Sequence, residues 1–224
     1  MSNALPPVIA IDGPSASGKG TVAQGVADAL GFHYLNSGAL YRTVAVAAIR
    51  AGLDLENESR LADIALNLKA KFSGDLVELE GKDVTESIRT EEVSATASRI
   101  AAYPSVRGAL LKRQRGLRRS PGLVADGRDM GTVVFPDAVL KIYLTATPEE
   151  RASRRYKQLM VKGLGATMAA LLQDIRARDA RDSDRAAAPL QQGADAILID
   201  TTRMTAAEAI AQVLALYKQA SRAL

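Results

Sequence analysis

Residues 13–21 read GPSASGKGT, and their types and spacing could hold a row of phosphate groups. The segment matches G-x-x-x-x-G-K between an apolar run and a helical pattern, a context in which backbone N–H groups and a helix N-terminus surround phosphate. A lysine in this place contacts the outer phosphates, so Lys19 is a candidate catalytic residue. The candidate phosphate-binding residues are Gly13, Pro14, Ser15, Ala16, Ser17, Gly18, Lys19, Gly20 and Thr21.

The residue after the lysine departs from the usual phosphate loop. Gly20 stands where a serine or threonine usually ligates Mg²⁺, and Thr21 follows one place later. We therefore do not expect a hydroxyl at residue 20 to ligate the metal, and the Gly-Lys-Gly-Thr form resembles nucleoside monophosphate kinases. The sequence contains no Asn-Lys-x-Asp motif, which argues against a GTPase.

A second group of chemistry-bearing residues is the run RARDARDSDR at residues 176–185. Four of them are spaced i, i+3, i+4 and i+7, which places them on one face of a helix: Arg178, Arg181, Asp182 and Arg185. Such a face could bind an anionic, hydroxylated ligand beside a phosphate site. The alternative is a solvated face with surface ion pairs, and we expect that role for the residues off this face, which are Arg176, Asp179 and Asp184.

These residue types suit transfer to a phosphate acceptor. Such an acceptor arrives deprotonated, so it needs positioning and charge neutralisation rather than a general base. The chain is rich in arginine and has one histidine, His33, for which we expect a structural or surface position.

The elements that position these residues follow from hydrophobic patterning. Short apolar runs alternate with helical patterns, which favours a parallel sheet with helices on both faces, an α/β fold. The predicted strands cover residues 8–11, 32–35, 123–126, 139–144 and 196–200.

One predicted helix carries further arginines. Its start, with a capping box, is expected at Thr147, Pro148 and Glu150. One side of this helix carries Arg151, Arg154 and Arg155, and the segment VKGLGAT that follows is typical of a mobile lid.

A smaller part of the chain has a different pattern. Residues 76–88 alternate apolar and polar types about a Gly-Lys-Asp turn, which predicts an antiparallel ribbon outside the main sheet. We expect this ribbon to belong to an inserted subdomain of about residues 37–103.

The composition limits the class of protein. The chain has 224 residues, 47% of them apolar, and no cysteine, so disulfides and thiolate metal sites are excluded. We find no long apolar run and no signal core, and we expect a cytoplasmic protein without a membrane partner. The pI is near 9.4 but the net charge is only +4, and the basic run KRQRGLRR at residues 112–119 has interleaved leucines, so we expect no nucleic-acid partner.

Four motifs follow one another in the chain: GPSASGKGT, NSGALYR at residues 36–42, ADGRDMGTVVFPDA at 125–138 and RARDARDSDRAAAPL at 176–190. Together with the helix EEVSATASRIAAYPSVR they resemble the bacterial cytidylate kinase family over nearly the whole chain. The resemblance implies a P-loop nucleoside monophosphate kinase fold with a central five-stranded parallel sheet flanked by helices. It implies a core of residues 1–36, 104–155 and 173–224, a nucleoside-monophosphate-binding subdomain of residues 37–103 and a lid of residues 156–172.

The resemblance also implies the reaction, in which ATP, with Mg²⁺, phosphorylates CMP and dCMP. ATP would contact the phosphate loop and Arg154. The CMP phosphate would contact Ser37, Arg42 and Arg128, and the cytosine would contact Ser98, Arg107 and Asp129. A carboxylate can accept from the exocyclic amine of cytosine, whereas uracil presents an oxygen there. The ribose would contact Arg178 and Asp182, and the phosphates in transfer would contact Arg181 and Arg185.

Asp126 and Asn36 are two further residues with expected roles or departures from the family pattern. Asp126 would support Mg²⁺ through water or orient Arg128, and no residue is expected to ligate the metal directly. The family's second motif usually begins with Asp, where this chain has Asn36. We expect a monomer with small-molecule substrates. The rival functions are a P-loop kinase for UMP, AMP or a metabolite hydroxyl, a nucleic-acid-binding protein, and a nucleotide sensor without catalysis.

Overall fold

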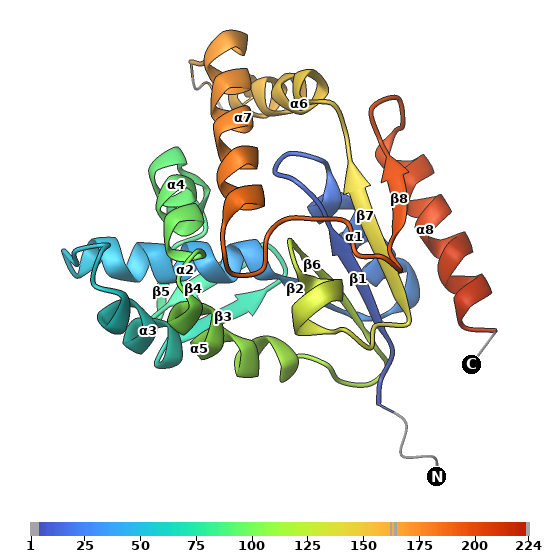
Figure 1. Cartoon of the computed structure of the whole chain (residues 1–224), viewed down its shortest axis with the longest axis horizontal. Helices are drawn as coiled ribbons and strands as arrows, with labels where there is room; N and C mark the ends of the chain where they lie inside the picture. Colours follow the sequence, from blue (N-terminus) through green and yellow to red (C-terminus); the bar gives the residue numbers. More distant parts are fainter. Residues whose placement is uncertain (1–4, 162, 164, 223–224) are drawn as a thin grey trace. The chain divides into compact units, whose positions relative to one another are not determined.

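The computed structural model describes residues 5–161, 163 and 165–222 (Figure 1). The chain forms two compact units, each with its own hydrophobic core. Unit 1 comprises Met1–Leu35 and Leu117–Leu224, and unit 2 comprises Asn36–Gly116.

Unit 1 is built on a five-stranded sheet. Its strands are β1 (Val8–Asp12), β2 (His33–Asn36), β6 (Leu123–Gly127), β7 (Leu140–Thr145) and β8 (Ile197–Asp200), in the order β2-β6-β1-β7-β8. β1 lies in the middle and pairs in parallel with both β6 and β7, and β7 pairs in parallel with β8 (Figure 1). Each predicted strand forms, so the predicted α/β fold is confirmed. All of β1 is buried, as its apolar run requires.

The helices of unit 1 are α1 (Lys19–Leu30), α6 (Pro148–Val161), α7 (Met168–Asp184) and α8 (Ala206–Ala220). Apolar residues of α1 and α8 are buried in one cluster with residues of β1, β6, β7 and β8, so these two helices cover the sheet together. The short π-helical turn η2 (Met130–Val134) follows β6. Gly25 allows α1 and α8 to approach closely, because a Cβ there would lie 2.4 Å from Cδ1 of Ile210.

Local capping explains where the helices of unit 1 start. Thr205 and Glu208 form a full capping box at α8. The predicted start of α6 at Pro148 is confirmed, and Thr147 Oγ1 accepts from the Glu150 amide at 3.3 Å. The predicted capping box is wrong in its second bond, because the Thr147 amide donates to Thr202 Oγ1 at 3.0 Å, while the Glu150 carboxylate accepts from Arg154 Nε at 2.9 Å.

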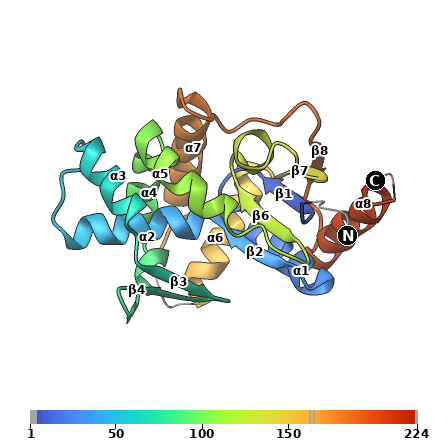
Figure 2. The same ribbon diagram turned by 90° about the horizontal axis from the view of Figure 1, so that it is seen from below.

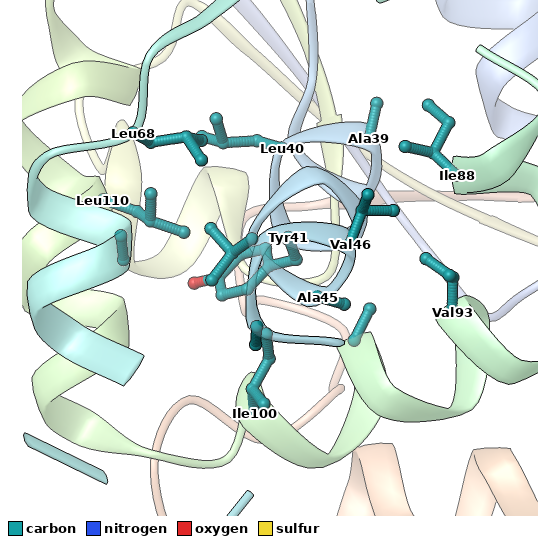
Figure 3. Close-up of a cluster of buried hydrophobic side chains, with 14 of the residues drawn as sticks. Ala39, Leu40, Tyr41, Ala45, Val46, Leu68, Ile88, Val93, Ile100 and Leu110 are labelled. Carbon is teal, nitrogen blue, oxygen red and sulfur yellow. The ribbon is translucent and has the colours of Figure 1, made fainter. Parts of the chain in front are cut away.

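Unit 2 is mainly helical. Its helices are α2 (Ser37–Arg50), α3 (Glu58–Leu66), α4 (Glu91–Ile100) and α5 (Pro104–Arg115), with a short 3₁₀ turn η1 (Ser87–Arg89). Figure 3 shows apolar side chains of α2, among them Leu40 and Val46, surrounded by Leu68, Ile100 and Leu110 from other segments. Because α5 contributes to this core, the unit extends to Gly116, beyond the end at residue 103 that the sequence predicts for the inserted subdomain.

The ribbon of unit 2 has three antiparallel strands, β3 (Ala70–Ser73), β4 (Leu76–Leu79) and β5 (Lys82–Asp83), of which β3 and β4 are labelled in Figure 2. The position predicted for the turn, Gly-Lys-Asp at residues 81–83, is wrong. Glu80 and Gly81 form the turn, with φ of 52° and 77°, while Lys82 and Asp83 pair with β4. Two successive positive φ values match the twist of a hairpin, but glutamate is not a usual sequence signal for them. β3 was not predicted.

The helices bear on two predictions, that the protein has no membrane partner and that residues 156–172 form a lid. Within the described residues, none of the helices is long and apolar enough to cross a bilayer. The lid predicted at residues 156–172 includes the end of α6 and the start of α7, while Lys162 and Leu164 lie outside the described residues.

Candidate active site

The phosphate loop connects β1 to α1. Gly13 has φ of 154°, and a Cβ on it would lie 2.0 Å from the carbonyl oxygen of Leu144 on β7, so only glycine fits. Ala16 and Gly18 also have positive φ, and Gly18 is the N-cap of α1. A loop with several residues of positive φ is typical of segments whose successive N–H groups surround an anion.

The polar side chains of the loop fit a polyphosphate. The hydroxyls of Ser15 and Ser17 are buried and lack a hydrogen-bond partner among the described residues. Lys19 is buried, and its Nζ donates to the carbonyl oxygen of Pro14 at 3.0 Å. Burial, together with the positive charge of Arg128, lowers the pKa of Lys19 to about 7. Orphaned donors and an under-compensated ammonium are the groups that ATP phosphates would satisfy.

Two arginines of α6 hold the carbonyl groups of this loop. Arg151 donates from Nη1 to Ser15 O at 3.2 Å and from Nε to Ala146 O at 3.0 Å. Arg154 donates from Nη1 to Ser17 O at 3.0 Å and from Nη2 to Thr201 O at 2.6 Å. These bonds fix the loop, and a direct contact of Arg154 with ATP stays a prediction.

A cluster of opposed charges lies beside Lys19. Asp182 of α7 is buried, and its Oδ2 accepts from Arg128 Nε at 2.9 Å. Burial works against the charge of Asp182, but Arg128 and Arg178 outweigh it and hold its pKa below the usual range, with Arg185 adding to the effect. The charges of Arg128, Arg178 and Asp182 also act on Lys19. The predicted helix face is thus next to the phosphate loop.

Other residues of α7 behave differently from this cluster. Arg181 is exposed, although it shares the predicted face. Arg176 is exposed and pairs with Glu149, as predicted for a solvated position, and Asp184 is exposed as well. The prediction for Asp179 is wrong: both its oxygens accept from Arg151, which is only 3% exposed, with Nη1 to Oδ1 at 3.0 Å. The packing of α6 on α7 creates this pair.

Asp126 stands at the end of β6, facing the first turn of α1. Its buried Oδ2 accepts from the Tyr34 hydroxyl at 2.6 Å. A Cβ on Gly20 would lie 3.5 Å from this oxygen, so the position that usually bears a metal-binding hydroxyl is next to a carboxylate. The described residues contain no group of three His, Cys, Asp or Glu side chains that could hold a metal ion. A single carboxylate beside the loop suits a Mg²⁺ ion that keeps water and phosphate ligands, and support of such an ion by Asp126 stays a prediction.

Sequence reasoning missed one buried acid of this region. The carboxylate of Asp12, the last residue of β1, accepts from the amides of Met130 and Gly131, each at 2.8 Å. Burial raises the pKa of Asp12 to about 7, against the lowering effect of these two bonds. An acid that ends a fully buried strand was the available signal in the sequence.

Asp129, a predicted cytosine contact, is buried in unit 1 directly before η2, and the other predicted acceptor residues belong to unit 2. Ser37 is the first residue of α2 and is buried, while the Asn36 side chain caps this helix by accepting from the Ala39 amide at 2.8 Å. Asn36 is therefore the N-cap residue of α2. Arg42 lies on α2, Ser98 on α4, and Arg107 on α5, where its Nη1 donates to Ala101 O at 3.1 Å.

Comparison with known proteins decides the family. The family model described as cytidylate kinase matches residues 9–219. The cytidylate kinase of Nitrosomonas europaea is 56% identical over 217 residues, which are 97% of each chain. That of Cupriavidus necator is 59% identical over 207 residues, 92% of this chain and 93% of its own. The chain belongs to the cytidylate kinase family.

Membership of the cytidylate kinase family confirms the resemblance carried by the ordered motifs. Among solved structures, a gluconokinase from Sinorhizobium meliloti 1021 aligns with 96% of this chain and 93% of its own, at 16% identity and a TM-score of 0.48. The cytidylate kinase motifs thus identify the family, while the role of each single residue stays a prediction.

Proposed function

We propose that the protein transfers the γ-phosphoryl group of ATP to CMP, giving CDP and ADP, and that dCMP is a second acceptor. The observation that carries this proposal is the cluster of Arg128, Arg178, Asp182 and Arg185 beside the phosphate loop. Phosphoryl transfer needs positioning and neutralisation of charge, which guanidinium groups supply. A phosphate acceptor needs no general base, and His33, the only histidine, binds Ser120 O instead.

On the donor side, the loop of residues 13–21 would hold the ATP phosphates. The orphaned hydroxyls of Ser15 and Ser17 would donate to phosphate oxygens, and Lys19 would become fully charged against them. Bound Mg²⁺ would neutralise charge on the donor phosphates, and Asp126 would hold its water ligands. Arg154 is a further candidate contact on this side.

On the acceptor side, Arg128 would bind the CMP phosphate. Its Nε donates to Asp182 and its Nη1 to Gly127 O at 3.3 Å, so the guanidinium group is held in one orientation in which its remaining N–H groups would meet the ligand. Ser37 and Arg42 of unit 2 are the other predicted phosphate contacts. Arg178 and Asp182 would bind the ribose hydroxyls, and Arg185, with Arg181, would face the phosphates in transfer.

The base would be read by Asp129, with Ser98 and Arg107. Asp129 is only 4% exposed, and its carboxylate could accept from the exocyclic amine of cytosine, whereas uracil presents an oxygen there. This asymmetry favours cytosine over uracil. We also keep as proposals that the enzyme is a cytoplasmic monomer without a nucleic-acid or membrane partner.

The test is release of ADP from ATP and Mg²⁺ with CMP, dCMP, UMP, AMP and GMP offered separately. We expect CMP and dCMP to be strongly preferred, and Asp129→Ala to lose roughly tenfold or more in kcat/KM for CMP, the loss expected for one hydrogen bond to a charged group. Preference for another acceptor would overturn the substrate. Full CMP turnover in Asp129→Ala would overturn the base-reading role.

A further inference from the structure

Asp12 lies directly before the phosphate loop and binds a segment far away in sequence. Its two carboxylate oxygens accept from the amides of Met130 and Gly131, each at 2.8 Å. These are the first amides of η2, and the bonds within that turn begin with Val133 N to Asp129 O at 2.9 Å. A helix start leaves its first amides without internal acceptors, so Asp12 acts as their cap.

The two amides that Asp12 binds directly follow two predicted acceptor-side residues in the chain. Arg128 and Asp129 immediately precede Met130, and Gly127 before them is the register partner of Asp12 in the β1–β6 pair. The two-residue segment is therefore held at one end by strand pairing and at the other end by the Asp12 side chain. Both attachments lead to the same residue, and Gly13 of the phosphate loop is the next residue in the chain.

We propose that Asp12 is a positioning residue, which fixes Arg128 and Asp129 relative to the phosphate loop by holding the amides of Met130 and Gly131. The inference rests on the acceptor-side roles proposed above for Arg128 and Asp129. It adds a residue that touches neither substrate and acts through its neighbours.

The electrostatic surroundings fit positioning better than stabilisation. Burial makes the ionised form of Asp12 costly and raises its pKa, while the two amides and Arg128 favour the charge and Asp129 opposes it. The charge of Asp12 also acts on Tyr143, its register partner on β7. Burial of this carboxylate is unfavourable, and both of its oxygens accept from a single turn. Holding that turn in place explains why the chain keeps an acid at this position.

The experiment uses the full chain with Asp12→Asn, which keeps the size of the side chain but turns an amide N–H group toward one of the two donors. We expect kcat/KM for CMP to fall roughly tenfold or more, and the Kd for ATP, measured without CMP, to change less than about threefold. Asp28→Asn is the matched control, because Asp28 is an exposed acid on α1 whose carboxylate accepts from Gln24 Nε2 at 2.7 Å on the same helix. We expect both constants to be unchanged in that variant.

A double-mutant cycle separates positioning from a general structural role. If Asp12 acts through Arg128 and Asp129, Asp12→Asn lowers kcat/KM for CMP clearly less in an Arg128→Ala or an Asp129→Ala background than in the wild type. Additive losses in both backgrounds, or equal losses of ATP and CMP affinity, would overturn the inference while leaving the proposed function intact. Unchanged CMP kinetics in Arg128→Ala would overturn the proposed role of Arg128, and this inference with it.

A second variant tests the inference if Asp12→Asn does not fold. Asp12→Glu keeps the charge and moves the carboxylate by one methylene, so we expect the same selective loss of CMP turnover in the same assays. Wild-type kinetics for CMP in Asp12→Glu would count against positioning by these two bonds.

Discussion

At the scale of single residues, Gly13 makes the sharpest demand on the chain. We expect Gly13→Ala to lower the free energy of unfolding by about 3 kcal/mol or more, because its Cβ would lie 2.0 Å from a backbone oxygen and its φ of 154° disfavours alanine. Gly108 offers the matched control, since it lies within α5 with no atom near an added Cβ. We expect Gly108→Ala to stabilise the protein by about 0.5–1 kcal/mol. Urea unfolding measures both, and equal effects of the two substitutions would contradict this reading.

The candidate site was predictable where its residues are contiguous or lie on one helix face. The phosphate loop is a single segment, and Arg178 and Asp182 lie one turn apart on α7, so the sequence contains their arrangement. The helical placement predicted for Arg185 is wrong, because α7 ends at Asp184 and Arg185 follows it in an extended conformation. Asp12 and Tyr34 act across the sheet, where Asp12 binds residue 131 and Tyr34 binds residue 126. Such pairs depend on strand order, which local patterns do not specify.

At the scale of elements, the pair of Arg151 and Asp179 joins α6 to α7. Arg151 is 3% exposed and also holds Ser15 O, so removing its carboxylate partner would leave a buried guanidinium uncompensated. We expect Asp179→Asn to lower the free energy of unfolding by about 2 kcal/mol, less than for a fully buried pair because Asp179 is partly exposed. Asp184→Asn, an exposed acid of the same helix, should change it by less than about 0.5 kcal/mol. Chemical denaturation of the two variants side by side decides the matter, and equal stability would mean that the pair contributes little.

The elements themselves were largely predictable, for a physical reason. The central strands β1 and β6 are short apolar runs buried on both faces, a pattern typical of the interior of a parallel sheet. The ribbon of unit 2 is less regular: β3 is mostly exposed, so its sequence AKFS lacks a clear apolar pattern. The role of Asp179 was missed because helical spacing shows which residues share a face but not what packs against the other faces.

At the scale of the whole molecule, function and stability conflict at Lys19. Its pKa is about 7 in the folded chain against an ordinary value of 10.5, so between these values the unfolded chain binds a proton that the folded chain does not. Stability from this group therefore rises with pH between about 7 and 10.5, and the cost is complete below pH 7. The pKa of Asp12 is raised from 3.8 to about 7, so ionisation of Asp12 lowers the free energy of unfolding progressively as pH rises from 3.8 to 7. Above pH 7 this unfavourable contribution is constant. Above neutrality, the pH slope separates Lys19 from Asp12.

We expect Lys19→Met to abolish phosphoryl transfer and yet raise the free energy of unfolding by roughly 3 kcal/mol at pH 7, because an apolar side chain of similar length carries no charge into the interior. The advantage over the wild type should shrink by about 1 kcal/mol per unit as pH rises to 9.5, since the wild type alone gains stability there. Urea unfolding in phosphate-free buffer at several pH values measures this, with Lys157→Met, an exposed lysine of α6, as the control that should show no such trend. A Lys19→Met protein that is less stable than the wild type at pH 7 would mean that the loop needs the ammonium for its own folding. The expected result would mean that the folded chain tolerates a buried lysine that is only partly charged at pH 7, and that bound phosphate would restore its full charge.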